Sequence, residues 1–383
     1  MNYVEVTQIS YGKRIGGAIK GIFLGLLLIV GAVILLWRNE GRTINTTIAL
    51  KEGEKITVNG SISPINTTLE GKLIYINGKA DTQEVLRDTT FKIQENAIKL
   101  YRKVSMYQWK EKEDTKTQDN VGGSQTQTTT YSYDQVWDSS RIDSSQFKEA
   151  GHTNPSHRTF DAQDSVSSDV RMGDIKLSNV FIGKMDNEKI ISLDSTRSTT
   201  FDAVKNISNA KIVNDVIYLG NGTLDNPQIG DIQISFYAVY PAEVSAIGQQ
   251  QGDQLVGYVA TNKNNVALLE YGAVSMPQMY IDAHNQNRII AWLLRGLGLL
   301  LLFIGFNLLL GLISTLASVL PFLGKIMGFG VGLISFILAL SIGSLVIMLA
   351  WLFVRPVLSI SLLCALIVII TMVLTQNIPP TNT

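Results

Sequence analysis

Four long apolar stretches constrain this chain more than any other feature. They cover residues 15–37, 289–313, 329–354 and 357–375, and the third runs for 26 residues without a charged side chain. A helix needs about 20 mostly apolar residues to cross the roughly 30 Å of hydrocarbon in a bilayer. We therefore predict a multi-pass integral membrane protein with four transmembrane helices, one near the N-terminus and three near the C-terminus, and a short link of residues 314–328 between the second and the third.

The first apolar stretch resembles the start of a secretory signal, because Lys13, Arg14 and Lys20 precede it or lie at its start. No small-x-small cleavage site follows it. The stretch instead ends in Trp37, and tryptophan is typical of a membrane interface. These features favour a retained signal-anchor over a cleaved signal.

Basic residues beside the helices give a weak prediction of orientation. They slightly favour the N-terminal side of the first helix, and cytoplasmic segments are usually richer in Lys and Arg. We therefore expect cytoplasmic tails at residues 1–14 and 376–383, with a large domain, residues 38–288, on the far side of the membrane.

Charge and cysteine content exclude some classes of function. The 32 basic and 32 acidic residues give a net charge of zero, and the sequence contains no long run of like charges. We therefore predict no nucleic-acid partner. The single cysteine, Cys364, lies in an apolar stretch, which excludes an intrachain disulfide. We interpret it as a packed small residue.

The large domain carries mostly strand signals. Alternation over residues 97–111 predicts a long strand that pairs with residues 127–136, which leaves 112–125 as an exposed, mobile hairpin tip. Asn77-Gly78 follows alternating apolar residues and predicts a hairpin turn. We expect an α+β domain dominated by antiparallel β-sheet.

The large domain also contains a predicted helix and a possible boundary between subdomains. Residues 275–294 are expected to form a helix that continues into the second transmembrane helix. A division into two subdomains near residues 151–155 stays open.

The sequence offers no constellation for catalysis. It lacks a G-x-S-x-G elbow, a P-loop, an H-E-x-x-H motif and a dinucleotide glycine pattern. His152 and His157 lie five residues apart across Pro155, so they do not share a helix face, and His284 stands apart from both. We predict no catalytic residues, no metal ligands and no cofactor, and therefore no enzyme.

Candidate functional positions lie instead at membrane boundaries and in short motifs. We interpret residues 39–42 as a polar stop, with Gly41 turning the chain from helix into sheet. For Arg295 two interpretations stay open: an arginine whose head reaches the headgroups, or an ion pair or headgroup contact that positions the helix. Trp109 is expected to pack in the core or across strands. The candidates are Asn39, Glu40, Gly41, Arg42, Trp109, Gly230, Asp231, Trp292 and Arg295.

Several of these motifs, in this order, resemble the LUMA (transmembrane protein forty-three) family. They are Trp37-Arg-Asn-Glu-Gly-Arg42, Tyr107-Gln-Trp-Lys-Glu111, Asn154-Pro-Ser156, Gly230-Asp-Ile-Gln-Ile-Ser-Phe236 with Pro241, and Ala291-Trp-Leu-Leu-Arg295. The resemblance implies four spans and a lumenal or extracellular domain. For animal cells it implies the endoplasmic reticulum and inner nuclear membrane, and an organising or scaffold role. It carries over no catalytic residue, and in a prokaryote the compartment would be the cytoplasmic membrane.

Three functions follow as hypotheses. The leading one is a non-enzymatic scaffold whose far-side domain binds protein or lipid near the bilayer, with homo-oligomerisation left open. The second is a channel or transporter subunit, which with four helices would need to oligomerise. The third is a membrane-tethered hydrolase, which requires Asp, Glu or His residues to converge in a pocket.

Overall fold

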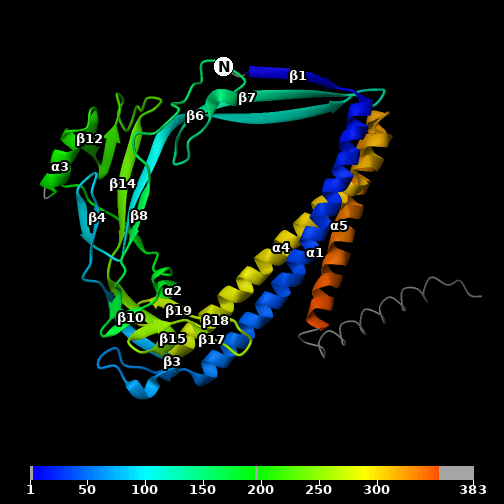
Figure 1. Cartoon of the computed structure of the whole chain (residues 1–383). Helices are drawn as coiled ribbons and strands as arrows, with labels where there is room; N and C mark the ends of the chain where they lie inside the picture. Colours follow the sequence, from blue (N-terminus) through cyan, green and yellow to red (C-terminus); the bar gives the residue numbers. More distant parts are fainter. Residues whose placement is uncertain (1–2, 195–196, 353–383) are drawn as a thin grey trace, which may run out of the picture. The chain divides into compact units, whose positions relative to one another are not determined.

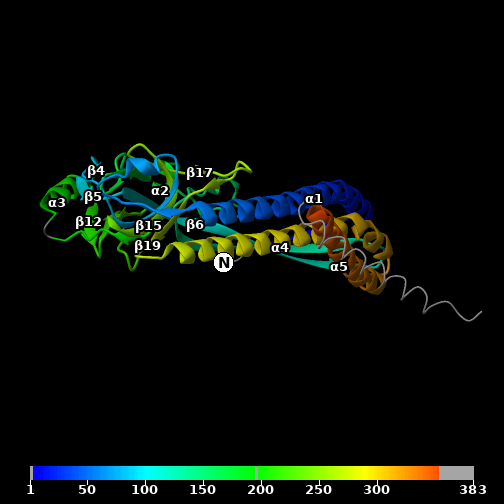
Figure 2. The ribbon, with the colours of Figure 1, turned by 90° about the horizontal axis from the view of Figure 1, so that it is seen from below.

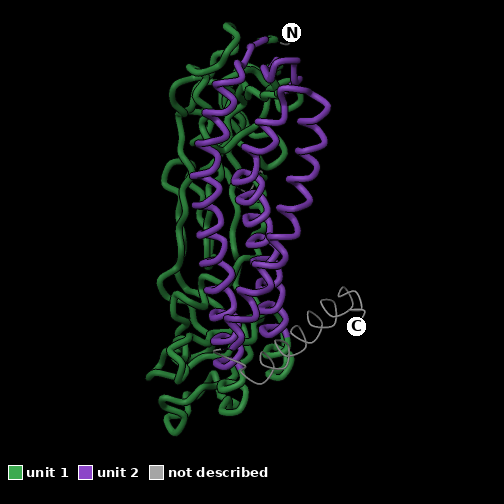
Figure 3. Tube along the Cα trace, turned by 90° about the vertical axis from the view of Figure 1, so that its right-hand side faces the viewer, with its two compact units in different colours: residues 1–5, 51–115, 129–281 green, residues 6–50, 116–128, 282–383 purple. Residues whose placement is uncertain are grey.

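The computed structural model describes residues 3–194 and 197–352. The chain divides into two compact units, coloured separately in Figure 3. Unit 1 comprises residues 1–5, 51–115 and 129–281 and is rich in strands. Unit 2 comprises residues 6–50, 116–128 and 282–383 and is mostly helical. The predicted fold class is confirmed, with one apolar helix before the β-rich part and two described after it. The predicted fourth helix (357–375) and the C-terminal tail lie outside the described residues.

An eight-stranded sheet contains the predicted long hairpin. Its order is β1-β7-β6-β14-β13-β12, with β8 pairing β6 and β11 pairing β14. Figure 1 labels β1, β6, β7, β8, β12 and β14 of this sheet. Residues 97–111 and 127–136 were predicted to pair, and β6 and β7 confirm that pairing. The strands are β1 (Tyr3–Ile9), β6 (Lys99–Asp119), β7 (Gln125–Asp138), β8 (Gln163–Val166), β11 (Glu188–Ile190), β12 (Ala210–Val213), β13 (Val216–Leu219) and β14 (Ile232–Val239).

Side-chain alternation explains why this sheet forms one wall of a core. β14 pairs antiparallel with β6, from Ile232 opposite Met106 to Val239 opposite Lys99. Ile232, Ile234 and Phe236 alternate with more exposed neighbours, as a strand with one buried face requires. The buried face packs with the small sheet β4 (Val85–Asp88) and β5 (Ile93–Asn96), the loop residue Phe91 and helix α3 (Ser198–Lys205).

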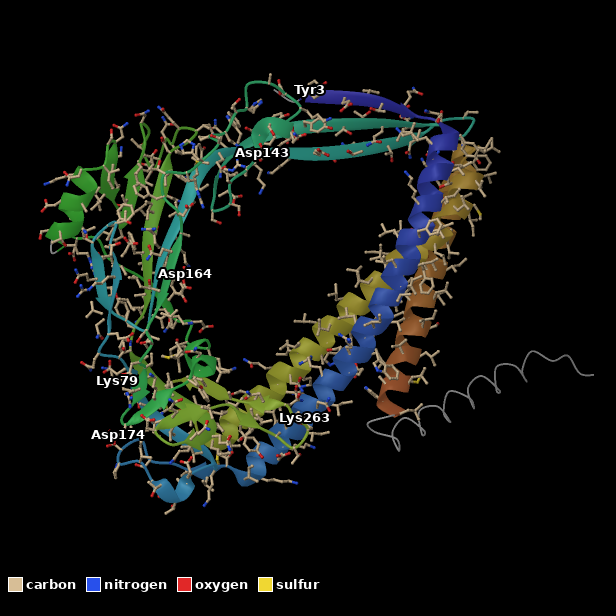
Figure 4. The ribbon with its side chains drawn as sticks, viewed as in Figure 1. Tyr3, Lys79, Asp143, Asp164, Asp174 and Lys263 are labelled. Atoms are coloured by element: carbon tan, nitrogen blue, oxygen red, sulfur yellow. The ribbon has the colours of Figure 1, made fainter. Side chains whose placement is uncertain are left out.

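A second, seven-stranded sheet completes unit 1. Its order is β19-β15-β16-β10-β9-β3-β2, and β15 also pairs with β3. Lys79 on β3 and Asp174 in the turn between β9 and β10 are labelled in Figure 4. The strands are β2 (Val58–Asn59), β3 (Leu73–Asp81), β9 (Arg171–Met172), β10 (Ile175–Leu177), β15 (Ala242–Gln251), β16 (Gln254–Val256) and β19 (Leu268–Tyr271). The remaining elements of unit 1 are η1 (Thr67–Leu69), η2 (Ser144–Gln146), α2 (Asn179–Ile182), β17 (Tyr258–Val259) and β18 (Asn265–Val266).

The predicted turn at Asn77-Gly78 is wrong, because both residues lie inside β3. β3 pairs with β15 without interruption, from Leu73 opposite Gln249 to Ala80 opposite Ala242. Asn77 donates through Nδ2 to the Ser245 hydroxyl at 3.0 Å. The backbone pairing of a whole strand thus outweighs a local turn preference. Unit 1 also shows no division at residues 151–155.

The apolar helices extend beyond the predicted membrane segments. α1 (Tyr11–Ile56) is 46 residues long, about 70 Å at 1.5 Å per residue. α4 (Met276–Ala317) confirms the predicted helix that continues into the second apolar stretch, and α5 (Pro321–Leu352) follows after three residues. The predicted link of residues 314–328 is therefore mostly helical. Figures 1 and 2 show α1 and α4 side by side.

Two expectations about local structure need correction. Gly41 was expected to turn the chain from helix into sheet, but it lies inside α1 and the helix continues for 15 residues to Ile56. The hairpin tip was expected to cover residues 112–125, but β6 continues to Asp119 and β7 starts at Gln125. Only residues 120–124 form the turn.

Candidate functional site: a buried ion pair between apolar helices

The most distinctive polar contact in unit 2 joins α1 and α4. Arg295 on α4 donates from Nε to Glu40 Oε1 at 2.6 Å and from Nη2 to Glu40 Oε2 at 2.8 Å. The Glu40 side chain is only 1% exposed and that of Arg295 is 14% exposed. This two-bond geometry matches the planar fork of a guanidinium to a carboxylate. Of the two interpretations of Arg295, the structure agrees with the one in which Arg295 forms an ion pair.

Aromatic rings flank the ion pair. The guanidinium carbon of Arg295 lies 4.7 Å from the centre of the Trp292 ring and 5.7 Å from that of Trp351 on α5. Trp351 also donates from its indole N–H to Glu40 Oε2 at 2.7 Å. Indole faces attract cations, so both rings stabilise the arginine while one of them satisfies the acid. The ion pair thus connects three helices.

A polar ladder continues along α1 and α4 from the ion pair. Asn39 is buried and donates from Nδ2 to the Ala291 carbonyl at 3.1 Å. Arg42 donates from Nη1 to Asn287 Oδ1 at 3.0 Å, and Asn287 in turn donates to the Thr43 carbonyl at 2.8 Å. These contacts explain why the polar residues 39–42 continue the helix instead of ending it. Asn39, Glu40 and Arg42 each have a partner on α4.

α1 and α4 also pack closely in their apolar parts. A Cβ on Gly25 of α1 would lie 2.6 Å from the Gly305 carbonyl oxygen of α4, and a Cβ on Gly305 would lie 2.9 Å from the Gly25 carbonyl oxygen. Glycine at such positions lets two helix backbones approach in an apolar environment. Ala32, Leu36, Leu302, Phe306, Ala339 and Val346 pack nearby as a buried cluster from all three helices. Sequence reasoning missed the Gly25–Gly305 contact, although small residues at four-residue spacing (Gly21 and Gly25) were a signal for it.

A pocket of about 420 Å³ lies beside the ion pair, with Thr43 and Thr47 of α1 and His284 and Arg288 of α4 among its lining. Glu40, Trp292, Arg295 and Trp351 also line it. The pocket therefore combines a buried, paired acid with aromatic rings and one exposed arginine, Arg288.

Trp109 lies in unit 1, on β6, where its backbone and its ring contact the loop of residues 152–154. Asn154 accepts from the Trp109 backbone N–H at 2.7 Å and donates to the Trp109 carbonyl at 2.9 Å, so it extends the edge of β6 like a short strand. The Trp109 ring meets His152 edge-on at 4.6 Å, and His152 stacks on Tyr133 at 3.9 Å. His152 is therefore packed among aromatic rings instead of lying free in a loop.

Gly230 and Asp231 also lie in unit 1, where they hold a turn. Gly230 has φ +94°, a conformation that favours glycine, and its N–H donates to the Tyr107 carbonyl at 2.9 Å. Asp231 is buried and accepts from the backbone N–H groups of Asn221, Gly222 and Gln228 and from the Tyr218 hydroxyl. Burial and the Asp231 carboxylate raise the pKa of Tyr218. Gly230 and Asp231 therefore stabilise a turn of unit 1, whereas the Glu40–Arg295 ion pair belongs to unit 2.

A third cluster holds the tip of the β6–β7 hairpin within unit 2. Arg14 on α1 pairs with Asp119 at 3.0 Å and donates to the Gly123 carbonyl at 2.7 Å. The Gly122 N–H donates to the Val319 carbonyl, in the turn between α4 and α5, at 3.0 Å. The tip is therefore fixed by charged and backbone contacts, contrary to the expectation of a mobile tip.

Metal binding has no support in the part of the chain that the structure describes, where no group of three or more His, Cys, Asp or Glu residues could hold an ion. Of the nine candidate residues, the structure brings together Glu40, Trp292 and Arg295, with Asn39 and Arg42 on the adjoining turn of α1. Trp351 completes the cluster, and sequence reasoning did not select it.

Comparison with known proteins gives one consistent result. The family model described as "Transmembrane protein 43" matches residues 106–356. Human transmembrane protein 43 is 31% identical over 364 residues, covering 91% of this chain and 88% of the human protein. The Drosophila melanogaster homologue is 30% identical over 356 residues, covering 90% of this chain and 91% of its own. No solved structure matches. With its apolar helices, its β-rich unit and this similarity along most of its length, the chain belongs to the transmembrane protein 43 family.

Proposed function

We propose that this membrane protein is a non-enzymatic scaffold whose β-rich unit binds a protein or lipid partner near the bilayer. This proposal rests on the observation that the buried acids Glu40 and Asp231 are occupied by contacts within the protein. Glu40 and Arg295 neutralise each other and tie three helices together, and Asp231 is bound by four donors. A catalyst or an ion carrier keeps such groups available for a substrate or a proton. Here they stabilise a fixed arrangement, which suits a protein that presents surfaces.

Site-specific photocrosslinking in native membranes tests the scaffold. A benzophenone amino acid replaces Val166 or Val259, two exposed residues of unit 1 that are 51% and 59% exposed. We expect each position to give a discrete adduct with a protein or a lipid, identified by mass spectrometry. The matched control carries the same group at Phe23, which is 69% exposed on the apolar part of α1 and should react with lipid. Absence of adducts at both positions of unit 1, together with turnover of a substrate or ion flux in proteoliposomes, would reject the scaffold.

The orientation of the chain has its own test, because the hairpin tip contacts Arg14. The predicted orientation puts residues 1–14 and 38–288 on opposite faces of the bilayer. An open β-ribbon such as β1-β7-β6 does not cross hydrocarbon, since the unpaired backbone groups at its edges would lose water. In a protein whose α1 crosses the bilayer, the tip contact and the predicted orientation therefore exclude each other.

Impermeant maleimide labelling of sealed vesicles decides between them. Single cysteines are placed at Thr7 and at Val121, which is 81% exposed in the tip, in a Cys364→Ser background. If the contact persists in the membrane, both cysteines react from the same side. Labelling from opposite sides would support the predicted orientation. The compartment is proposed from the family resemblance: the endoplasmic reticulum and inner nuclear membrane in a eukaryote, or the cytoplasmic membrane in a prokaryote.

A further inference from the structure

We propose that the pocket beside the Glu40–Arg295 ion pair binds the headgroup of an anionic glycerophospholipid, and that a neighbouring groove on α4 holds one of its acyl chains. This inference goes beyond the proposed function, because it places a lipid site in the helical unit 2 and not in the β-rich unit 1.

The pocket has basic groups that the helix contacts do not consume. Its lining contains two arginines, Arg288 and Arg295, against one acid, Glu40. Arg295 and Glu40 satisfy each other. Arg288 is exposed, and it donates from Nη2 to Asn285 Oδ1, in its own helical turn, at 2.5 Å. His284, one turn before Arg288, forms no hydrogen bond with any described residue. The pocket thus retains positive charge and free donors that fit a phosphate.

The neighbouring groove is apolar and begins where the pocket ends. It measures about 460 Å³ and is lined by Arg288, Ile289, Trp292, Leu293 and Gly296. Residues at spacings of three to four lie on one face of a helix, so this lining forms a continuous strip on α4. Ile289, Trp292 and Leu293 are 59%, 64% and 68% exposed. A Cβ on Gly296 would meet nothing within 4 Å, so the glycine leaves the groove open.

The two sites share Arg288 and Trp292, and this adjacency identifies the ligand. A glycerophospholipid carries its phosphate next to its acyl chains, so it would occupy both sites at once. α4 changes from polar to apolar between Arg288 and Ile289, which is the depth where headgroups meet hydrocarbon. Arginine near that boundary attracts anionic lipid. A soluble phosphate would use the polar pocket alone and leave the exposed apolar strip without a role.

Native mass spectrometry of the intact protein tests the site. The protein is released from detergent micelles that contain equal amounts of phosphatidylglycerol and phosphatidylcholine with the same acyl chains. We expect the wild type to retain phosphatidylglycerol preferentially. Arg288→Glu should weaken that retention about tenfold and remove the preference, because the substitution reverses a charge at the headgroup. Gly296→Leu should reduce retention of both lipids by filling the groove.

Matched controls separate the site from general effects. Arg38 is also exposed at the end of an apolar stretch but lines neither site, so Arg38→Glu should keep the preference. Gly311 is another open glycine of α4, and Gly311→Leu should leave retention unchanged. Unfolding midpoints in detergent verify that each variant is folded.

Three results would overturn the inference. Equal losses in Arg288→Glu and Arg38→Glu would mean a general surface charge effect. A change from dimer to monomer in Gly296→Leu, with lipid retention unaltered, would mean that a second copy covers the groove. Undiminished phosphatidylglycerol binding in both site variants would place the lipid elsewhere. If the protein adducts of unit 1 persist while the lipid result fails, the scaffold proposal stands and only this site is rejected.

Discussion

Replacement of Glu40 by alanine is expected to lower the free energy of unfolding by about 3 kcal/mol, because it leaves Arg295, which is only 14% exposed, without its counter-charge. The Glu40 carboxylate accepts from Arg295 Nε at 2.6 Å, from Arg295 Nη2 at 2.8 Å and from the Trp351 indole at 2.7 Å. After substitution the guanidinium would stay between two indole rings, largely shielded from water. Its desolvation would then be uncompensated.

A double-mutant cycle in mild detergent measures this coupling. Arg295→Ala should destabilise the protein similarly, and Glu40→Ala/Arg295→Ala should lose less than the sum of the single variants, because no charge remains buried alone. The control is Lys112→Ala, which breaks an ion pair with Asp134 whose side chains are 61% and 49% exposed. That substitution should change the free energy of unfolding by less than about 1 kcal/mol. If Glu40→Ala matched this control, the ion pair would have no stabilising role.

The sequence predicted the class of fold because its signals are long and periodic. Apolar stretches near 20 residues and two-residue alternation in β6 and β14 recur many times, so single exceptions do not hide them. The ion pair has no such signal. Glu40 and Arg295 are 255 residues apart, and each resembles an ordinary boundary residue until the helices are placed together. Their pairing depends on tertiary packing, which no local pattern encodes.

Helix ends were the least predictable feature for a related reason. Hydropathy marks where apolar side chains end, and we therefore expected the first helix to finish near Trp37. α1 continues because Asn39 and Arg42 bond to α4, so its polar turns are stabilised by a neighbouring helix instead of by a cap. The Asn77-Gly78 error has the same origin in β3, where the partner strand β15 determines the conformation.

Asp231→Ala is expected to destabilise unit 1 by about 4 kcal/mol, because each buried donor left unsatisfied costs about 1–3 kcal/mol and four donors depend on this side chain. Oδ1 accepts from the Asn221 N–H at 3.1 Å. Oδ2 accepts from the N–H groups of Gly222 at 3.1 Å and Gln228 at 2.7 Å, and from the Tyr218 hydroxyl. The carboxylate therefore organises the whole turn before β14.

The series Asp231→Ala, Asp231→Asn and Asp225→Ala distinguishes this role from a general effect of charge. Asparagine keeps one oxygen, which can still accept at the position of Oδ2, but it places an NH₂ group against the Asn221 N–H, so we expect an intermediate loss of about 2 kcal/mol. Asp225 is an exposed acid in the same loop, and its replacement should stay within about 0.5 kcal/mol. Chemical unfolding followed by tryptophan fluorescence gives all three values. Equal losses for Asp231→Asn and Asp231→Ala would show that the negative charge, and not the number of accepted bonds, holds the turn.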